Sequence, residues 1–157
     1  MNSTVPELMH ARVAALGVAI GLDPLVMDDD DQLDFELGNG LSMQLSSEPE
    51  QEAFLLSGVA GALPWPADSG LLIELLQGNF GWRDTQGATI SLDGDSPPNV
   101  AVAHRLFWAT LTDASFLAAF KGMQGLLDDL QAWLVAKAAA TPQAAGAPPG
   151  PRPGGFA

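Results

Sequence analysis

The sequence contains no cysteine and few basic residues, and both absences limit its chemistry. Without cysteine the chain has no disulfide, no thiolate nucleophile and no Cys-ligated zinc, a composition that suits a reducing cytosol. Only 6 Lys and Arg residues stand against 19 Asp and Glu residues, which gives a formal net charge of −13. Because Lys and Arg make most contacts to nucleic acids and to anionic membrane surfaces, we expect neither as a partner.

Long apolar runs are absent as well. The longest one, Val13 to Leu22, spans ten residues and contains two glycines, whereas a membrane-spanning helix needs about 20 residues. The N-terminus also lacks the positive region and apolar core of a signal peptide. We therefore expect a cytoplasmic protein.

Composition divides the chain into two parts. A hydrophobic content of 47% over 157 residues is enough for one core, and we expect a single domain over residues 1–137. Residues 138–157 are rich in Ala, Pro and Gly, with Arg152 as the only charged residue. Such a segment buries too little apolar surface to offset its ordering entropy, so the composition predicts a flexible tail.

The stretch from Asp68 to Leu92 organises the rest of the chain. Asp68 and Ser69 are suitable N-caps for a short helix, and a turn and a strand over residues 88–92 follow it. The apolar residues of this helix recur with a period near 3.6 and are Leu71, Leu72, Leu75, Leu76 and Phe80. A helix this short needs cover for its apolar face, which we expect to come from the sheet, from a second copy of the chain, or from both.

The remaining segments read as alternating helices and strands. A first helix carries Met9, Val13, Leu16 and Ile20 at helical spacing. Leu33, Phe35 and Leu37, then Leu41, Met43 and Leu45, alternate on either side of Gly38-Asn39-Gly40, which predicts a hairpin. A third strand is expected over residues 51–59 through Ala53, Leu55 and Ser57, and a further strand over residues 100–106.

A long helix beginning at Thr112 or Asp113 is the last predicted element. Its apolar residues are spaced by 4, 3, 4, 3 and 4, and they are Phe116, Phe120, Met123, Leu127, Leu130 and Leu134. The predicted order is therefore helix, three strands, helix, two strands, helix and tail, in an α+β protein.

Candidate chemical sites are weak. Asp28 to Asp31, with Asp34 and Glu36, is rich in carboxylates, but no frame supplies the Gly and Glu positions of an EF-hand, so a solvated acidic turn is the better interpretation. His10 and His104 lie near no nucleophile or metal-ligand partner in the sequence. A small enzyme or ligand-binding domain that uses its carboxylates remains an alternative.

Two segments carry a resemblance to a known family. Residues 71–80, Leu-Leu-Ile-Glu-Leu-Leu-Gln-Gly-Asn-Phe, lead to residues 87–93, Gly-Ala-Thr-Ile-Ser-Leu-Asp. This pattern resembles the class I type III secretion chaperones of the Tir-chaperone type, whose middle helix closes on an Asn before a Gly-x-x-Leu-x-Leu-type strand. The late helix with Phe116, Leu117, Phe120, Leu127 and Trp133 is similar to the closing helix of that family, whereas Gly78 departs from the usual Ala or Glu.

The resemblance implies a fold, a function and a set of contact residues. It implies a homodimeric bacterial α+β protein with an antiparallel twisted sheet flanked by helices, no cofactor, no metal and no catalytic residue. Such a chaperone binds the N-terminal segment of a secreted effector and keeps it soluble and export-competent; an adaptor or regulator that holds a non-effector protein is the alternative. By position in the family, the implied dimer-interface residues are Leu72, Leu75, Leu76, Phe80 and Ile90, and the implied partner-binding residues are Met9, Val13, Leu16, Leu33, Phe35, Met43 and Leu45.

Overall fold

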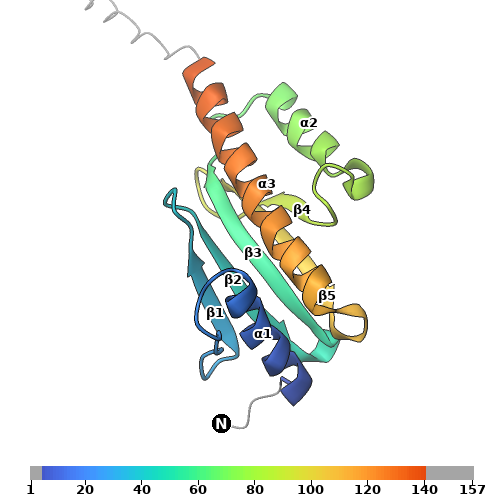
Figure 1. The fold of residues 1–157 in the computed structure, drawn as a ribbon. Helices are drawn as coiled ribbons and strands as arrows, with labels where there is room; N and C mark the ends of the chain where they lie inside the picture. Colours follow the sequence, from blue (N-terminus) through green and yellow to red (C-terminus); the bar gives the residue numbers. More distant parts are fainter. Residues whose placement is uncertain (1–4, 141–157) are drawn as a thin grey trace, which may run out of the picture.

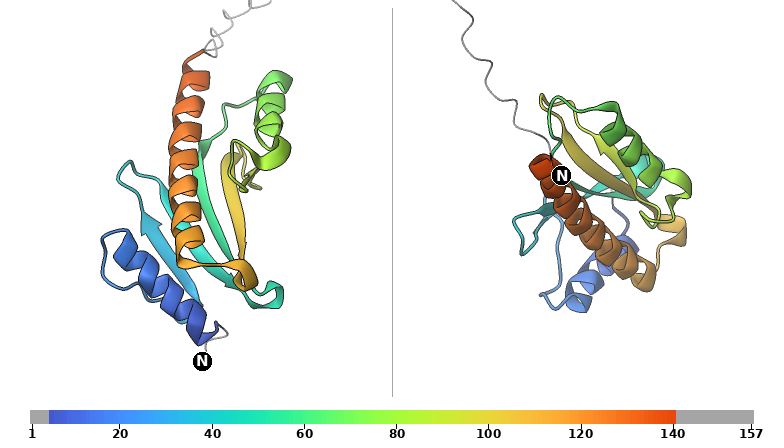
Figure 2. Two further views of the ribbon diagram at one scale, coloured as in Figure 1. Left: turned by 45° about the vertical axis from the view of Figure 1, so that its right-hand side comes forward. Right: turned by 90° about the horizontal axis from the view of Figure 1, so that it is seen from above.

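The protein is built on a five-stranded antiparallel sheet whose strand order is β1-β2-β3-β5-β4. The computed structural model describes residues 5–140. Helices α1 and α3 lie on the same side of the sheet, and α2 lies beside β4 at its edge (Figure 1, Figure 2). The elements are α1 (Glu7–Ala19), β1 (Gln32–Glu36), β2 (Ser42–Glu48), β3 (Ala53–Ala62), α2 (Ser69–Gly78), β4 (Thr89–Leu92), β5 (Asn99–Phe107) and α3 (Asp113–Ala140). This order confirms the predicted α+β fold.

The first two strands form the predicted hairpin. Leu33 pairs with Leu45 and Phe35 pairs with Met43, so the alternating apolar residues of both strands share one side. Gly40 takes a φ of 79°, and the backbone N–H of Leu41 donates to the Asn39 side-chain oxygen at 3.2 Å. The Gly-Asn-Gly turn therefore fixes the register that buries this apolar side.

Strand β3 was predicted, but its inward face was not. Phe54, Leu56 and Ala60 face the core, whereas of the three predicted residues only Ala53 is buried, and Leu55 and Ser57 are half-buried. A Cβ atom at Gly58 would lie 2.6 Å from the Leu127 Cδ1 atom of α3. Because glycine has no such atom, α3 can pack directly against the middle of β3.

Helix α3 fills the core as its spacing predicts. All six residues of the predicted apolar stripe are buried: Phe116, Phe120, Met123, Leu127, Leu130 and Leu134. The Phe116 ring stacks on Phe54 with centroids 5.9 Å apart, and Phe120 meets Phe35 edge to face at 4.9 Å. The helix continues to Ala140, three residues beyond the expected domain boundary, and the remainder of the predicted tail lies outside the described residues.

The connection between α2 and β4 packs tightly against β5 and α3. Gly87 has a φ of 96°, and a Cβ atom there would lie 2.9 Å from the His104 ring. Thr85 is buried and its hydroxyl has no hydrogen-bond partner. His104 lies half-buried under this connection, and burial lowers the pKa of its imidazole below the ordinary value of 6.5.

No helix within residues 5–140 is long and apolar enough to cross a membrane.

His104 makes stability depend on pH. Because burial lowers its folded-state pKa, the unfolded chain binds the proton first as the pH falls, and the folded state loses stability below about pH 6.5. His104→Gln should flatten the decrease in the free energy of unfolding between pH 7.5 and pH 5.5, measured by urea denaturation. An unchanged slope in His104→Gln contradicts the prediction.

Candidate functional site

The outer side of α1 carries a narrow apolar strip. Leu8, Ala11, Ala15 and Val18 recur every three or four residues, opposite the buried stripe of the same helix. Leu8 is 60% exposed and Val18 is 61% exposed. Two more exposed apolar side chains, Leu22 and Val26, follow in the segment after α1. Large apolar residues this exposed favour contact with another protein.

Most of the predicted partner-binding residues lie inside the protein rather than on its surface. Met9, Val13 and Leu16 face α3, and the core also buries Phe35, Met43 and Leu45; Leu33 alone is partly buried. As partner-binding residues, those of the hairpin were expected to face outward, but Phe35, Met43 and Leu45 face the core instead. The physical reason is that α1 and α3 cover this face of the sheet, so the regular apolar spacing marks the covered side of each element.

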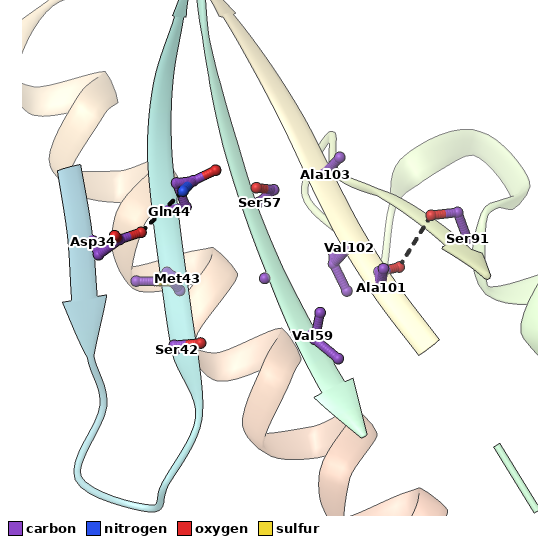
Figure 3. Close-up of a pocket in the computed structure, with 11 residues that line it drawn as sticks. Asp34, Ser42, Met43, Gln44, Ser57, Val59, Ser91, Ala101, Val102 and Ala103 are labelled. Atoms are coloured by element: carbon purple, nitrogen blue, oxygen red, sulfur yellow. Dashed lines mark hydrogen bonds between the residues drawn. The ribbon is translucent and has the colours of Figure 1, made fainter. Parts of the chain in front are cut away.

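The other face of the sheet is open within the described residues. A shallow hollow of about 360 Å³ runs across the strands. It is lined by the exposed Val59 and by small and polar side chains, namely Asp34, Ser42, Gln44, Ser57, Ser91, Ala101 and Ala103. Figure 3 shows these residues on the side of the sheet that faces away from the helices. Gln44 donates to Asp34 at 3.0 Å, and the Ser91 hydroxyl donates to the Ala101 carbonyl at 3.4 Å. Extended chain can lie across such a surface without meeting a bulky side chain.

A second apolar surface lies between α2 and the edge strand β4. Four of the five predicted dimer-interface residues line one groove of about 200 Å³, namely Leu72, Leu75, Leu76 and Ile90, together with Ser91 and Leu92. Leu75 and Ile90 form its floor, while Leu76 is 70% exposed. The fifth residue, Phe80, lies just beyond the helix and is 89% exposed. The predicted set thus gathers on one side of the molecule.

Helix α2 is held in place by polar contacts at both ends and along its length. The backbone N–H of Leu71 donates to the Asp68 carboxylate at 2.8 Å, which confirms the predicted N-cap. Glu74 accepts from the Lys137 ammonium at 2.7 Å and from the Trp133 indole at 3.3 Å, so α2 is tied to α3. The hydrogen bond from Lys137 is the main cause that lowers the pKa of Glu74.

Ion pairs use several of the few basic residues to join separate elements. Arg12 of α1 contacts Asp113 at the start of α3 at 2.6 Å. Arg105 of β5 donates two hydrogen bonds to Glu48 of β2, at 2.6 and 3.1 Å. This hydrogen bonding is the main cause that lowers the pKa of Glu48 and raises the pKa of Arg105. The acidic side chains that outnumber these cations give the accessible surfaces a negative potential.

Among residues 5–140, no group of three or more His, Asp or Glu side chains is placed to hold a metal ion. The half-buried His104 ring lies against a glycine-containing turn, and burial lowers the pKa of its imidazole. The surfaces described above are suited to binding a polypeptide through apolar and backbone contacts.

Sequence reasoning missed the exposed apolar residues of α1 and the open sheet face. Leu8 and Val18 lie outside the buried stripe of their helix, and only the small Ala11 and Ala15 continue their spacing, so the signal in the sequence was weak. The open face consists of small and polar residues that read as ordinary solvent-facing positions. Leu92 was assigned to a strand, but nothing in its spacing indicated that it borders the groove beside α2.

Several solved structures share this fold. A chain of the ExsC–ExsE complex is 19% identical, with a TM-score of 0.68 over 85% of this chain and 97% of that one. A chain of the HopA1–SchA chaperone–effector complex is 16% identical, with a TM-score of 0.64 over 82% and 99%. The Yersinia pestis type III secretion chaperone SycH in complex with a YscM2 fragment gives 14% identity and a TM-score of 0.62 over 80% and 98%.

At sequence identities this low, a shared fold does not assign the chain to a family, so the assignment comes from comparison of the sequence itself. No curated protein sequence matches the chain significantly. The model of the Tir chaperone protein (CesT) family, however, matches residues 13–131, which include the second half of α1, the whole sheet, α2 and most of α3. The chain is therefore a member of the Tir chaperone protein (CesT) family.

Proposed function

We propose that this protein is a type III secretion chaperone of the bacterial cytoplasm. It binds the N-terminal segment of a secreted effector, keeps that segment soluble and export-competent, and uses no cofactor or catalytic residue. The family match over residues 13–131 carries the proposal. The shared fold with the HopA1–SchA chaperone–effector complex supports it.

The exposed apolar strip of α1 is the first surface for the effector. An unfolded segment presents apolar anchors that have no core of their own, and Leu8 and Val18 offer exposed contact points for them. Each fully buried aliphatic anchor contributes about 1.5–3 kcal/mol, against the cost of ordering the segment. Several anchors must therefore bind together, which fits a strip better than a single pocket.

The core residues of the same elements have a supporting role in this proposal. Met9, Val13 and Leu16 hold α1 against the core, and Phe35, Met43 and Leu45 hold the hairpin, so the exposed strip and the open sheet face keep fixed positions. Leu33 lies on the edge strand β1 and is only partly buried. Among the predicted partner-binding residues of the hairpin, it alone keeps enough exposed side-chain surface to contact a partner directly.

The edge of the sheet provides a second mode of contact. Strand β1 is the terminal strand, and Asp28 is already bonded to both backbone groups of Gln32 at its start. The rest of its outer edge can accept an extended effector segment by strand addition. Asp34 and Glu36 lie on this strand, and the acidic run at residues 28–31 precedes it. These carboxylates favour effector segments with basic residues by steering their approach more than by adding affinity.

The groove between α2 and β4 is the proposed homodimer interface. Leu72, Leu76 and Phe80 would contact the second copy, with Leu75 and Ile90 packed behind them. Burial of the exposed Phe80 ring and Leu76 side chain removes a large apolar surface from water, which favours association.

The effector-binding prediction is tested by coexpression with the product of the neighbouring reading frame. The wild-type protein should co-elute with that product's N-terminal segment in size-exclusion chromatography with light scattering. Val18→Asp places a charge on the α1 strip and should raise the dissociation constant for the segment about tenfold or more, measured by calorimetry.

Val135→Asp is the matched control, since Val135 of α3 is 66% exposed against 61% for Val18 and receives the same substitution. It should bind the segment as the wild-type protein does. Equal binding by both variants would remove the α1 strip from the proposal, and no retained segment with the wild-type protein would contradict the chaperone function itself.

The dimer prediction is tested at Leu76. Leu76→Asp should give a folded monomer, because the side chain is 70% exposed in a single chain and an unpaired charge would lie in the interface. Light scattering measures the mass and circular dichroism the fold. Leu75→Asp is less informative, since Leu75 is buried and the variant can unfold. A dimeric Leu76→Asp protein, beside an unaffected Val135→Asp control, would place the interface elsewhere.

A further inference from the structure

Asn79 joins the end of α2 to the edge strand β4 through its side chain. The Ile90 backbone N–H donates to the Asn79 Oδ1 atom at 2.8 Å, and the Asn79 Nδ2 atom donates to the Ile90 carbonyl at 3.0 Å. One carboxamide thus satisfies both backbone groups of Ile90 on the side of β4 that faces away from β5. It makes the two bonds that a residue of a neighbouring strand would make at this position.

The chain around Asn79 brings its side chain close to β4. Gly78 precedes it, and a Cβ atom at Gly78 would lie 3.2 Å from the Ile90 Cδ1 atom. This contact is tighter than an ordinary side-chain contact, so the missing Cβ lets the end of α2 approach Ile90. Nearby, the Ala88 N–H donates to the Thr85 carbonyl at 3.0 Å. The outer edge of β4 is therefore bonded to its own connection at Ala88 and Ile90.

We propose that Asn79 is the positioning residue that fixes α2 on β4 and so assembles the groove between them. Leu72, Leu75 and Leu76 come from α2, whereas Ile90 and Leu92 come from β4. The two sides form one groove only when the helix keeps its place along the strand. The two hydrogen bonds of Asn79 set that place, because they fix both the distance and the register between Asn79 and Ile90.

The same bonds determine how a partner uses this surface. At Ile90 both backbone groups of β4 are already paired with Asn79, so an incoming strand cannot pair there without displacing the carboxamide. A second copy of the chain therefore joins through apolar side chains of α2 and β4 and not by continuing the sheet. This step depends on the proposed homodimer, whereas the positioning role of Asn79 within one chain does not.

The test measures hydrogen exchange at the Ile90 amide in full-length protein. A Leu76→Asp background removes protection by a second copy, so the exchange rate reports contacts within one chain. Asn79→Ala in that background should accelerate Ile90 exchange about tenfold or more while the Phe54 and Val102 amides keep their rates. Gln77→Ala, at an exposed site two residues away on α2, is the control and should leave the Ile90 rate unchanged.

Asn79→Asp is a second variant that keeps an acceptor for the Ile90 N–H but lacks the donor for the Ile90 carbonyl. Without the Leu76→Asp change, Asn79→Ala and Asn79→Asp should each raise the dimer dissociation constant about tenfold or more, and Gln77→Ala should not.

An Ile90 exchange rate that Asn79→Ala leaves unchanged overturns the positioning role. Faster Ile90 exchange with an unchanged dimer constant overturns the link to the groove. A wild-type monomer would refute the homodimer alone, because Ile90 exchange can still be measured.

Discussion

The contact between α3 and β3 at Gly58 governs the layout of the molecule. The helix can lie directly on the middle strand because no Cβ intervenes between Gly58 and Leu127. The buried stripe of α3 continues from Leu127 in both directions along the helix, to Phe116, which contacts Phe54 of β3, and to Leu134. Helix α1 packs beside α3. With one face of the sheet filled in this way, the opposite face and the outer side of α1 remain available for a partner. A one-sided core thus leaves uncovered the surfaces that we propose for binding.

The sequence predicts the elements of this core well because each has a local cause. The spacing from Phe116 to Leu134 is regular enough to identify all six buried residues of α3. The hairpin follows from strict alternation around Gly38-Asn39-Gly40, and α2 begins at the Asp68 cap as expected. Strand β3 shows the limit, since its inward face is decided by the fit of Gly58 to a helix some 70 residues away, which no local pattern records.

The proposed partner-binding surface was much less predictable than the core. Apolar periodicity identifies the face that is covered, so Met9, Val13, Leu16 and Phe35 were found correctly as a stripe but belong to the interior. The exposed side of α1 has only two large apolar residues, Leu8 and Val18, with two alanines between them, and it becomes visible only once the covered side is known. The α2 surface was easier, because the helix has too many apolar residues for one chain to cover, and Leu76 and Phe80 remain exposed. An excess of apolar residues in a short helix was therefore the useful signal.

The distribution of charge also affects how the folded chain responds to salt. Three ion pairs, at Arg12, Arg105 and Lys137, join different elements, yet all three involve partly exposed groups whose attraction is modest in water. The larger electrostatic effect is the mutual repulsion implied by a net charge of −13. Physiological ionic strength screens such repulsion beyond about 8 Å, whereas the paired atoms lie much closer together. Moderate ionic strength therefore weakens the repulsion among the carboxylates more than it weakens the attraction within the ion pairs. The folded state of this chain gains stability as a result.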